Sequence, residues 1–282
     1  MGELQEINPS QNTLVSSLSV ILPIHQADNS MMPFVHALKL AFASKGELEI
    51  VDVRREDEAL EYIGVRALLE KWGVLPNSSK RSDVIDAGIR IKKIVKSGNK
   101  KAEIIKRIRR HSHDLLVIGT KSVKGIGAIF GRDLAEYLAD YFRHNTLFIP
   151  SGSRPFVDMN TGNVNLNNIV VPVESAEFFN PAIEKIRKLL ELFPEVNARI
   201  IGLHVGNRFP DVDHSMLSGL NWETELRKES VHSSIISSCR DHNADLLVMG
   251  TNGRQGLSQI LIGSNTEQVL RESQCPVLSI AV

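Results

Sequence analysis

The sequence predicts an α/β protein made of two tandem, doubly wound domains, and three observations lead to this class. Short continuous apolar runs alternate with longer amphipathic segments, as expected for a parallel sheet that helices cover on both faces. The chain has 282 residues, a length that favours two domains over one. Similar segments also occur once in each half, since residues 113–120 and 244–251 share seven aligned residue types or close substitutes, including Asp114 and Asp245.

The repeated segments extend back to the beginning of each half. Pro23 and Pro172 lie at the same place within matching apolar runs, and residues 50–53 match residues 202–205 further along. Repeated supersecondary units indicate repeated domains. We therefore expect one domain at residues 1–152, a linker at 153–167 and a second domain at 168–282.

Each half contains the same succession of predicted elements. In the first half we expect strands near 19–24, 47–53, 89–95, 114–119 and 146–150, and helices near 31–44, 56–72, 100–111 and 133–142. In the second half we expect strands near 168–173, 198–205, 222–229, 245–250 and 277–281, and helices near 179–192, 231–242 and 264–273. Residues 206–220, rich in Gly, Pro, Asp and Ser, are expected to form a loop.

Composition indicates a globular protein without an obvious charged partner. Lys plus Arg and Asp plus Glu number 33 each, so net charge suggests neither nucleic acid nor a membrane surface. Cys239 and Cys275 match no metal-site spacing and predict free thiols in a reducing compartment. The first apolar run, residues 14–24, is too short to span a bilayer. We therefore expect a cytoplasmic protein without a membrane partner.

The stretch from Gly250 to Thr266 has the features of a phosphate-binding loop. Gly250 and Gly253 follow an apolar strand and let the backbone turn close to a ligand. After nine residues come Gly263 and then Ser264, Asn265 and Thr266, whose backbone N–H groups would lie at a helix N-terminus, where the dipole favours anions. The carboxyl end of a central strand is also where open α/β sheets bind ligands.

The same residues have a structural explanation. Ser264 and Glu267 form a capping-box pattern that needs no ligand. The stretch is neither a Walker A loop nor the dinucleotide fingerprint. No Ser-His-Asp set, acid pair or metal-ligand set can be assigned, so we predict no catalytic residue and no metal site. Nucleotide binding and simple helix capping both remain open at this point.

The spacing of Gly250, Gly253, Gly263 and Ser264 resembles the ATP-binding motif of the universal stress protein family. The resemblance extends over nearly the whole chain, twice. It implies Rossmann-like domains of the adenine nucleotide alpha hydrolase type, each with a five-stranded parallel sheet of order 3-2-1-4-5. It also implies that ATP, or another adenine nucleotide, binds in the C-terminal domain, with or without Mg²⁺. The implied contacts are Pro172, Val173, Glu174, Val205, Met249, Gly250, Gly253, Gly263, Ser264, Asn265 and Thr266.

The matching loop in the first half departs from that motif. Ser122 replaces the second glycine, the loop is one residue shorter, and Arg132 and Asp133 follow Gly131 where the family carries a hydroxyl. A carboxylate at the position of Asp133 would repel phosphate. His25 also stands where the family has Asp. We therefore expect a degenerate nucleotide site in the N-terminal domain.

The resemblance leaves three functional hypotheses. The first is a stress-response protein in which the bound nucleotide acts as a sensor or controls partner choice. The second is a slow ATPase, and the third is a structural or interaction protein without a nucleotide. Family members commonly pair through their last strands, so we expect residues 147–149 and 277–280 to join the two domains as a pseudo-dimer within the chain. A homodimer of the whole chain is a further expectation.

A basic segment at residues 90–110 suggests an anionic partner. It lacks interleaved aromatic residues and a recognition motif, so a solvated helix face and strand edge explain it better than nucleic-acid binding. Its basic residues are Arg90, Lys92, Lys93, Lys96, Lys100, Lys101, Lys106, Arg107, Arg109 and Arg110.

Overall fold

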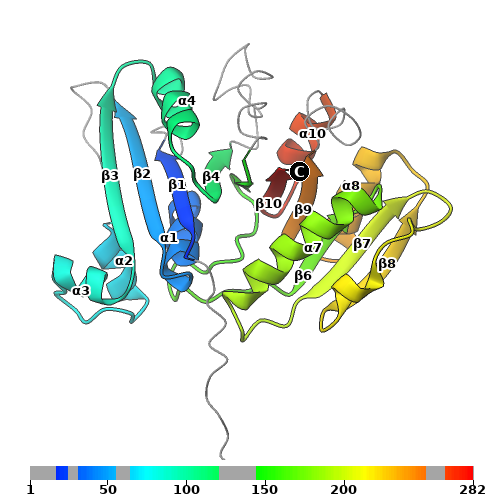
Figure 1. Cartoon of the computed structure of the whole chain (residues 1–282), viewed down its shortest axis with the longest axis horizontal. Helices are drawn as coiled ribbons and strands as arrows, with labels where there is room; N and C mark the ends of the chain where they lie inside the picture. Colours follow the sequence, from blue (N-terminus) through cyan, green and yellow to red (C-terminus); the bar gives the residue numbers. More distant parts are fainter. Residues whose placement is uncertain (1–16, 25–30, 55–63, 121–143, 252–263, 282) are drawn as a thin grey trace, which may run out of the picture.

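The computed structural model describes residues 17–24, 31–54, 64–120, 144–251 and 264–281. Within these residues the N-terminal half contributes five strands to one sheet (Figure 1). They are β1 (Ser19–Ile24), β2 (Glu47–Arg54), β3 (Arg90–Ser97), β4 (Leu115–Thr120) and β5 (Thr146–Pro150). Their spatial order is β3-β2-β1-β4-β5, and they pair in parallel. The order 3-2-1-4-5 expected for this half is therefore confirmed.

The C-terminal half repeats this order. Its strands are β6 (Asn168–Pro172), β7 (Arg199–Val205), β8 (Asn221–Arg227), β9 (Leu246–Thr251) and β10 (Val277–Ala281). From the outer edge inward they follow the order β8-β7-β6-β9-β10, again in parallel. All ten predicted strands are present, and their ends differ from the predicted ones by at most a few residues.

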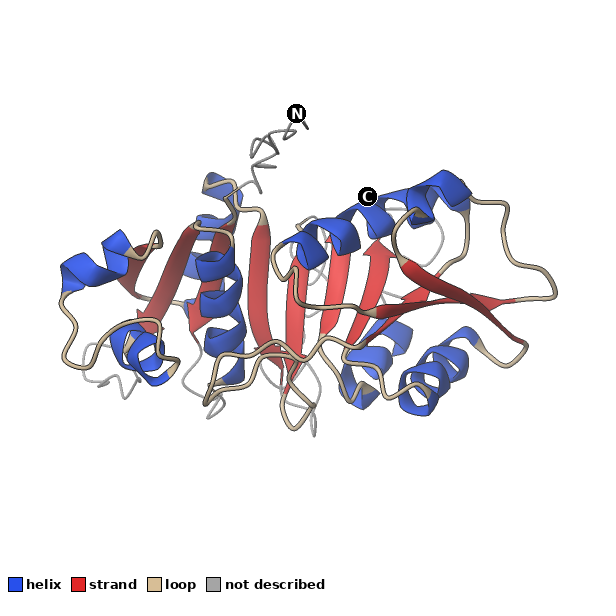
Figure 2. Ribbon diagram, turned by 90° about the horizontal axis from the view of Figure 1, so that it is seen from below, coloured by secondary structure: helices blue, strands red, loops and turns tan. Residues whose placement is uncertain are grey.

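The two halves share one continuous sheet, which Figure 2 shows as a single row of strands. β5 and β10 pair antiparallel, with Phe148 opposite Val277, Leu147 opposite Leu278 and Thr146 opposite Ser279. The expected contact between the last strands is thus present. One prediction needs correction. We expected two separate parallel sheets, whereas the described residues form one ten-stranded sheet with an antiparallel pair at its centre.

Helices cover both faces of the sheet. One face carries α1 (Met32–Ala43), α2 (Val65–Lys71), α3 (Arg81–Asp86) and α7 (Ala176–Glu191). The other face carries α4 (Lys100–Arg110), α8 (Val231–Asp241) and α10 (Ser264–Glu272). Alternate strand residues supply the two cores, so Val20 and Leu22 pack toward α1 whereas Ile21 packs toward α4. Burial on both faces explains why the strands are continuous apolar runs.

Some local predictions need correction. The expected helix at 56–72 appears in the described residues as α2, which ends at Lys71, and residues 55–63 lie outside them. α3 was not predicted; Asp83 accepts a hydrogen bond from the Lys80 N–H at 2.7 Å and stabilises its first turn. The expected loop at 206–220 contains a short 3₁₀ helix, η1 (His214–Leu217). The helix expected at 133–142 lies outside the described residues.

The segment that we expected to be a linker packs against the N-terminal half and is hydrogen-bonded to the C-terminal half through Arg154. Phe156 and Val157 are buried in the same core as α1. The Trp72 indole N–H donates to the Met159 carbonyl at 3.1 Å, and the Trp72 ring lies so close to Gly162 that a Cβ there would be 2.6 Å from it. Gly162 also has φ of +70°, a conformation that glycine adopts readily. The segment is therefore fixed by packing.

The repeated aspartate before the fourth strand of each half ties that strand to the first. Asp114 accepts the Ser19 N–H at 2.8 Å. Asp245 accepts the Asn167 N–H at 2.8 Å and the Asn168 N–H at 3.0 Å. These bonds satisfy backbone donors where β1 and β6 begin.

Among the helices of the described residues, none is long and apolar enough to cross a membrane.

Candidate functional site

Most of the described residues of the expected nucleotide site meet at one edge of the sheet. β6 pairs with β7 on one side and with β9 on the other. The connection after β6 leads to β7 on one side and the connection after β9 leads to β10 on the other, which is the kind of position where open α/β sheets bind ligands. Pro172 ends β6, Val205 ends β7, and Met249 and Gly250 lie at the end of β9. The structure thus brings these four residues to adjacent strand ends.

Val173 follows β6 and is held by its neighbours on β7. Its N–H donates to the Leu203 carbonyl at 2.7 Å, and its own carbonyl lies 2.7 Å from the Nδ1 atom of His204. Because a carbonyl can only accept, Nδ1 of His204 carries the proton. The Val173 side chain is 2% exposed. A ligand bound next to Val173 would therefore contact a backbone segment that hydrogen bonds to β7 hold in place.

His204 was not among the predicted contacts, although it lies near the end of β7. A Cβ on Gly206 would be 2.5 Å from the ring nitrogen Nε2. The His204 ring packs edge-on against Phe209, with ring centres 6.0 Å apart. The contacts continue through Trp222 to Phe179. A histidine at a strand end followed two residues later by glycine is the only sequence signal for this arrangement.

Met249 and Gly250 lie on opposite faces of β9. The Met249 side chain is buried in the core that includes Val269 and Leu270 of α10. A Cβ on Gly250 would be 2.8 Å from the Phe178 ring of α7. Glycine at this position is therefore required by helix packing, a reason that the sequence did not reveal.

The remaining contacts are partly described. Glu174 is exposed and precedes Ser175, which occupies the N-cap position of α7 without a side-chain capping hydrogen bond. Ser264, Asn265 and Thr266 form the first turn of α10, as expected. Gly253 and Gly263 lie outside the described residues, as does the corresponding N-terminal segment at 121–143.

A separate charged cluster lies on the α4 face of the N-terminal half. Glu49 of β2 is 1% exposed, and both its oxygens accept from the Arg107 guanidinium at 2.5 Å. The Lys92 Nζ is 3.3 Å from Glu49 and the His113 Nε2 is 3.8 Å away. Burial alone raises the pKa of Glu49, but hydrogen bonds from Arg107 and Lys92 outweigh it and hold this pKa below its ordinary value.

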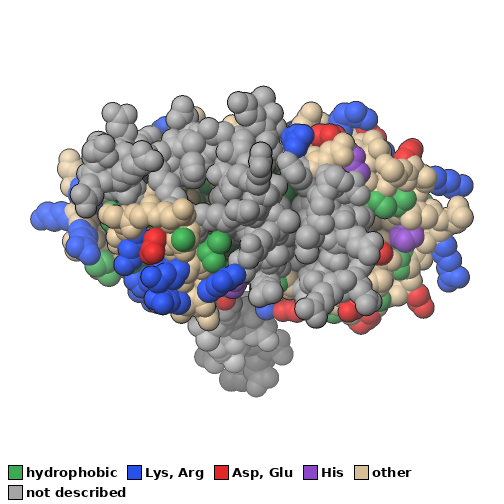
Figure 3. Space-filling view, turned by 90° about the horizontal axis from the view of Figure 1, so that it is seen from above, with side chains coloured by type: hydrophobic (Ala, Val, Ile, Leu, Met, Phe, Trp, Pro, Cys, Tyr) green, Lys and Arg blue, Asp and Glu red, His purple; other side chains and the backbone are tan. Residues whose placement is uncertain are grey.

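The cluster is next to the surface where basic side chains gather. Lys and Arg side chains are prominent on the N-terminal part of the molecule in Figure 3. Several of the exposed ones belong to β3, which is an edge strand, and to α4. Charges on an edge strand prevent pairing with another chain. The described geometry therefore agrees with the structural explanation of this segment.

Comparison with known proteins finds similarity in the C-terminal half. The sequence model of the universal stress protein family matches residues 211–280, which include the whole of the Gly250 to Thr266 stretch. A universal stress protein of Methanocaldococcus jannaschii is 40% identical over 60 residues. The C-terminal half of the chain is therefore similar to the universal stress protein family. The aligned part is 21% of this chain and 35% of that relative, so the chain spans about a third of its length.

Other relatives agree. A universal stress protein of Synechocystis is 37% identical over 62 residues, which are 22% of each chain. The structure of a universal stress protein from Archaeoglobus fulgidus superposes with a TM-score of 0.63 at 18% identity and covers 95% of this chain and 97% of that one. A functionally unknown protein from Pseudomonas aeruginosa gives 0.61 at 15% identity, with 95% and 94% covered. These structural likenesses show that both halves share their fold with these proteins.

Proposed function

We propose that the C-terminal half binds an adenine nucleotide at the carboxyl ends of β6 and β9 and that the protein acts in the stress response as a nucleotide-dependent sensor or interaction module. The similarity to universal stress proteins supports the stress-response role. The observation that carries the nucleotide proposal is the place of the glycine-rich stretch. It begins at the end of β9 beside the reversal of chain direction, and α10 begins where it ends.

The first turn of α10 supplies the proposed phosphate contacts. The first N–H groups of a helix have no partner within the helix, and they attract anions together with the helix dipole. Residues 264–266 are in this position. Gly253 and Gly263 would let the backbone approach the phosphates. The base and ribose would lie toward Val173, Glu174 and Val205.

The two halves would act as one unit through the β5–β10 pairing, in effect a pseudo-dimer within the chain. The C-terminal half would carry the nucleotide. The N-terminal half, with its altered loop, would supply the partner surface of that pair. Self-association of the whole chain would add to this arrangement.

Isothermal titration calorimetry with ATP, ADP and AMP tests the proposal. We expect binding at millimolar or lower concentration, which Gly263→Val abolishes because a side chain blocks the approach of phosphate. The matched control is Gly131→Val in the first half, which should leave binding unchanged.

Absence of binding by the wild-type chain at millimolar nucleotide would overturn the proposal and favour a ligand-free interaction protein. Phosphate release that Ser264→Ala eliminates, while nucleotide still binds, would indicate a slow ATPase.

A further inference from the structure

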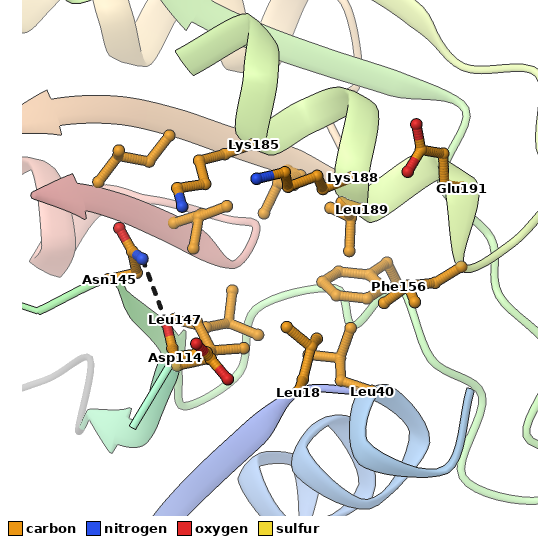
Figure 4. A pocket seen from close by; sticks show the side chains of 15 residues that line it. Leu18, Leu40, Asp114, Asn145, Leu147, Phe156, Lys185, Lys188, Leu189 and Glu191 are labelled. Carbon is orange, nitrogen blue, oxygen red and sulfur yellow. Dashed lines mark hydrogen bonds between the residues drawn. The ribbon is translucent and has the colours of Figure 1, made fainter. Parts of the chain in front are cut away.

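A cavity of about 250 Å³ lies between the two halves, on the face of the sheet that carries α1 and α7 (Figure 4). α1 contacts β5 and α7 contacts β10, so the two helices flank the antiparallel centre of the sheet. The lining is mainly aliphatic and comes from both halves. It includes Leu147 of β5, Leu278 and Ile280 of β10, Leu40 of α1, Leu189 of α7 and Phe156.

The polar side chains of the cavity are unevenly distributed. Lys185 and Lys188 extend from α7 along one wall, Glu191 lies at the end of the same helix, and Asp114 and Asn145 lie on the opposite wall in Figure 4. Asp114 is engaged by the Ser19 N–H. Lys188 is bound to Glu184 at 2.7 Å.

Lys185 differs from these groups. It is half-buried, and among the described residues no carboxylate lies within 4.0 Å of its Nζ. Its aliphatic stem can therefore cover apolar surface while the ammonium group stays available at the rim.

We propose that this cavity binds a small amphipathic carboxylate, with its apolar body on the leucines and its carboxylate at Lys185. Ligand sites are mostly apolar with a few polar groups that fix orientation, and this lining has that character. A cavity of about 150 Å³ takes one benzene molecule, so this one holds about ten non-hydrogen atoms. A straight-chain carboxylate such as octanoate has this size and charge.

The site is independent of the nucleotide site. The cavity includes Leu246 at the start of β9, whereas Gly250 lies near the end of that strand. Because the walls come from both halves, a bound ligand stabilises the joined state of β5 and β10 against separation.

Methyl NMR of the full chain with labelled Leu and Ile tests the proposal, with octanoate as the probe and 1-octanol as its neutral analogue. We expect saturable shifts confined to the cavity methyls. Octanoate should bind about three- to tenfold more tightly than octanol, as expected for one charge-assisted contact. Lys185→Gln should remove this difference.

Two further variants complete the test. Lys228→Gln, at an exposed lysine after β8, is the charge-matched control and should bind octanoate like the wild type. Leu189→Trp should fill the cavity and abolish the shifts.

Three results would overturn the proposal. Octanol could bind as tightly as octanoate, Lys185→Gln could leave the affinity for octanoate unchanged, or no saturable shift could appear at millimolar octanoate. A shift that disappears at high protein concentration, together with dimer formation in sedimentation, would instead assign this face to a second copy of the chain. Nucleotide binding can fail without affecting any of these results.

Discussion

The two halves place different types of side chain between the sheet and the helix that covers it. Glu49 in β2 lies opposite Ile21 of β1 in the N-terminal half, and Ile201 in β7 lies opposite Val170 of β6 in the C-terminal half. All four face α4 or α8. The N-terminal half therefore has a carboxylate where the C-terminal half has a branched aliphatic side chain.

The C-terminal half carries its carboxylate one strand further out. Glu225 of the edge strand β8 accepts hydrogen bonds from Ser238 at 2.5 Å and from Arg227 at 2.6 Å, and its side chain is 20% exposed. Glu49 is almost fully buried and depends on Arg107. The fold thus accepts either a carboxylate or an aliphatic side chain at this position of the second strand. A carboxylate there requires a cation on the covering helix, because an unpaired buried charge is costly.

The largest expected effect comes from removing that cation. Arg107→Ala leaves the Glu49 carboxylate buried with weaker compensation, and we expect the free energy of unfolding to fall by about 3–5 kcal/mol. Ser238→Ala in the C-terminal half should cost only about 1–2 kcal/mol, because Glu225 keeps Arg227. Urea unfolding followed by circular dichroism measures both.

A double variant separates the charge from the packing. Glu49→Ile with Arg107→Leu gives the N-terminal half the apolar filling of the other half and should recover most of the stability lost in Arg107→Ala. If the double variant is as unstable as Arg107→Ala, the loss of stability comes from lost packing volume and not from the unpaired charge of Glu49.

Acid sensitivity should also come from the N-terminal half. His36 of α1 is fully buried, its Nδ1 donates to the Met32 carbonyl at 2.7 Å, and its ring packs edge-on against Phe156. Burial lowers the pKa of His36 from 6.5 to about 4, despite the bond to Met32. The unfolded chain therefore binds the proton first as the pH falls, and stability decreases between pH 6.5 and pH 4 by about 3 kcal/mol.

His36→Gln should lack this decrease. Above pH 6.5 we expect a constant difference in unfolding free energy between wild type and variant. As the pH falls to 4, the wild type should lose stability relative to the variant. Parallel curves for the two proteins across this range would mean that His36 titrates normally or that its environment opens in acid.

The smallest effect distinguishes the two repeated aspartates. Asp245 accepts two backbone N–H groups and also lies 3.2 Å from Arg154, whereas Asp114 accepts one such N–H through its carboxylate. Asp245→Ala should therefore destabilise the chain by about 2 kcal/mol and Asp114→Ala by about 1 kcal/mol. Thermal unfolding at neutral pH measures the difference, and equal losses would remove the distinction.

Much of the fold was predictable because its signals are local. The apolar runs around Pro23 and Pro172 gave the first strands, and the repeated Asp-Leu-Leu-Val segments gave the fourth. Four of the implied nucleotide contacts, Pro172, Val205, Met249 and Gly250, do meet at neighbouring strand ends. Glu49 was not recognised as buried, because in a strand covered on both faces the pattern of residues does not say which polar side chain has a partner across the layer.

The sequence by itself determined the fold class and the same order of strands in each half, because periodicity and turn residues act over a few neighbouring positions. Only the tertiary structure decided that β5 and β10 join the two halves into one sheet and that Gly250 makes room for Phe178. It also placed Lys185 over a cavity shared by both halves. These facts depend on distances between residues far apart in the chain, and such distances are set by packing.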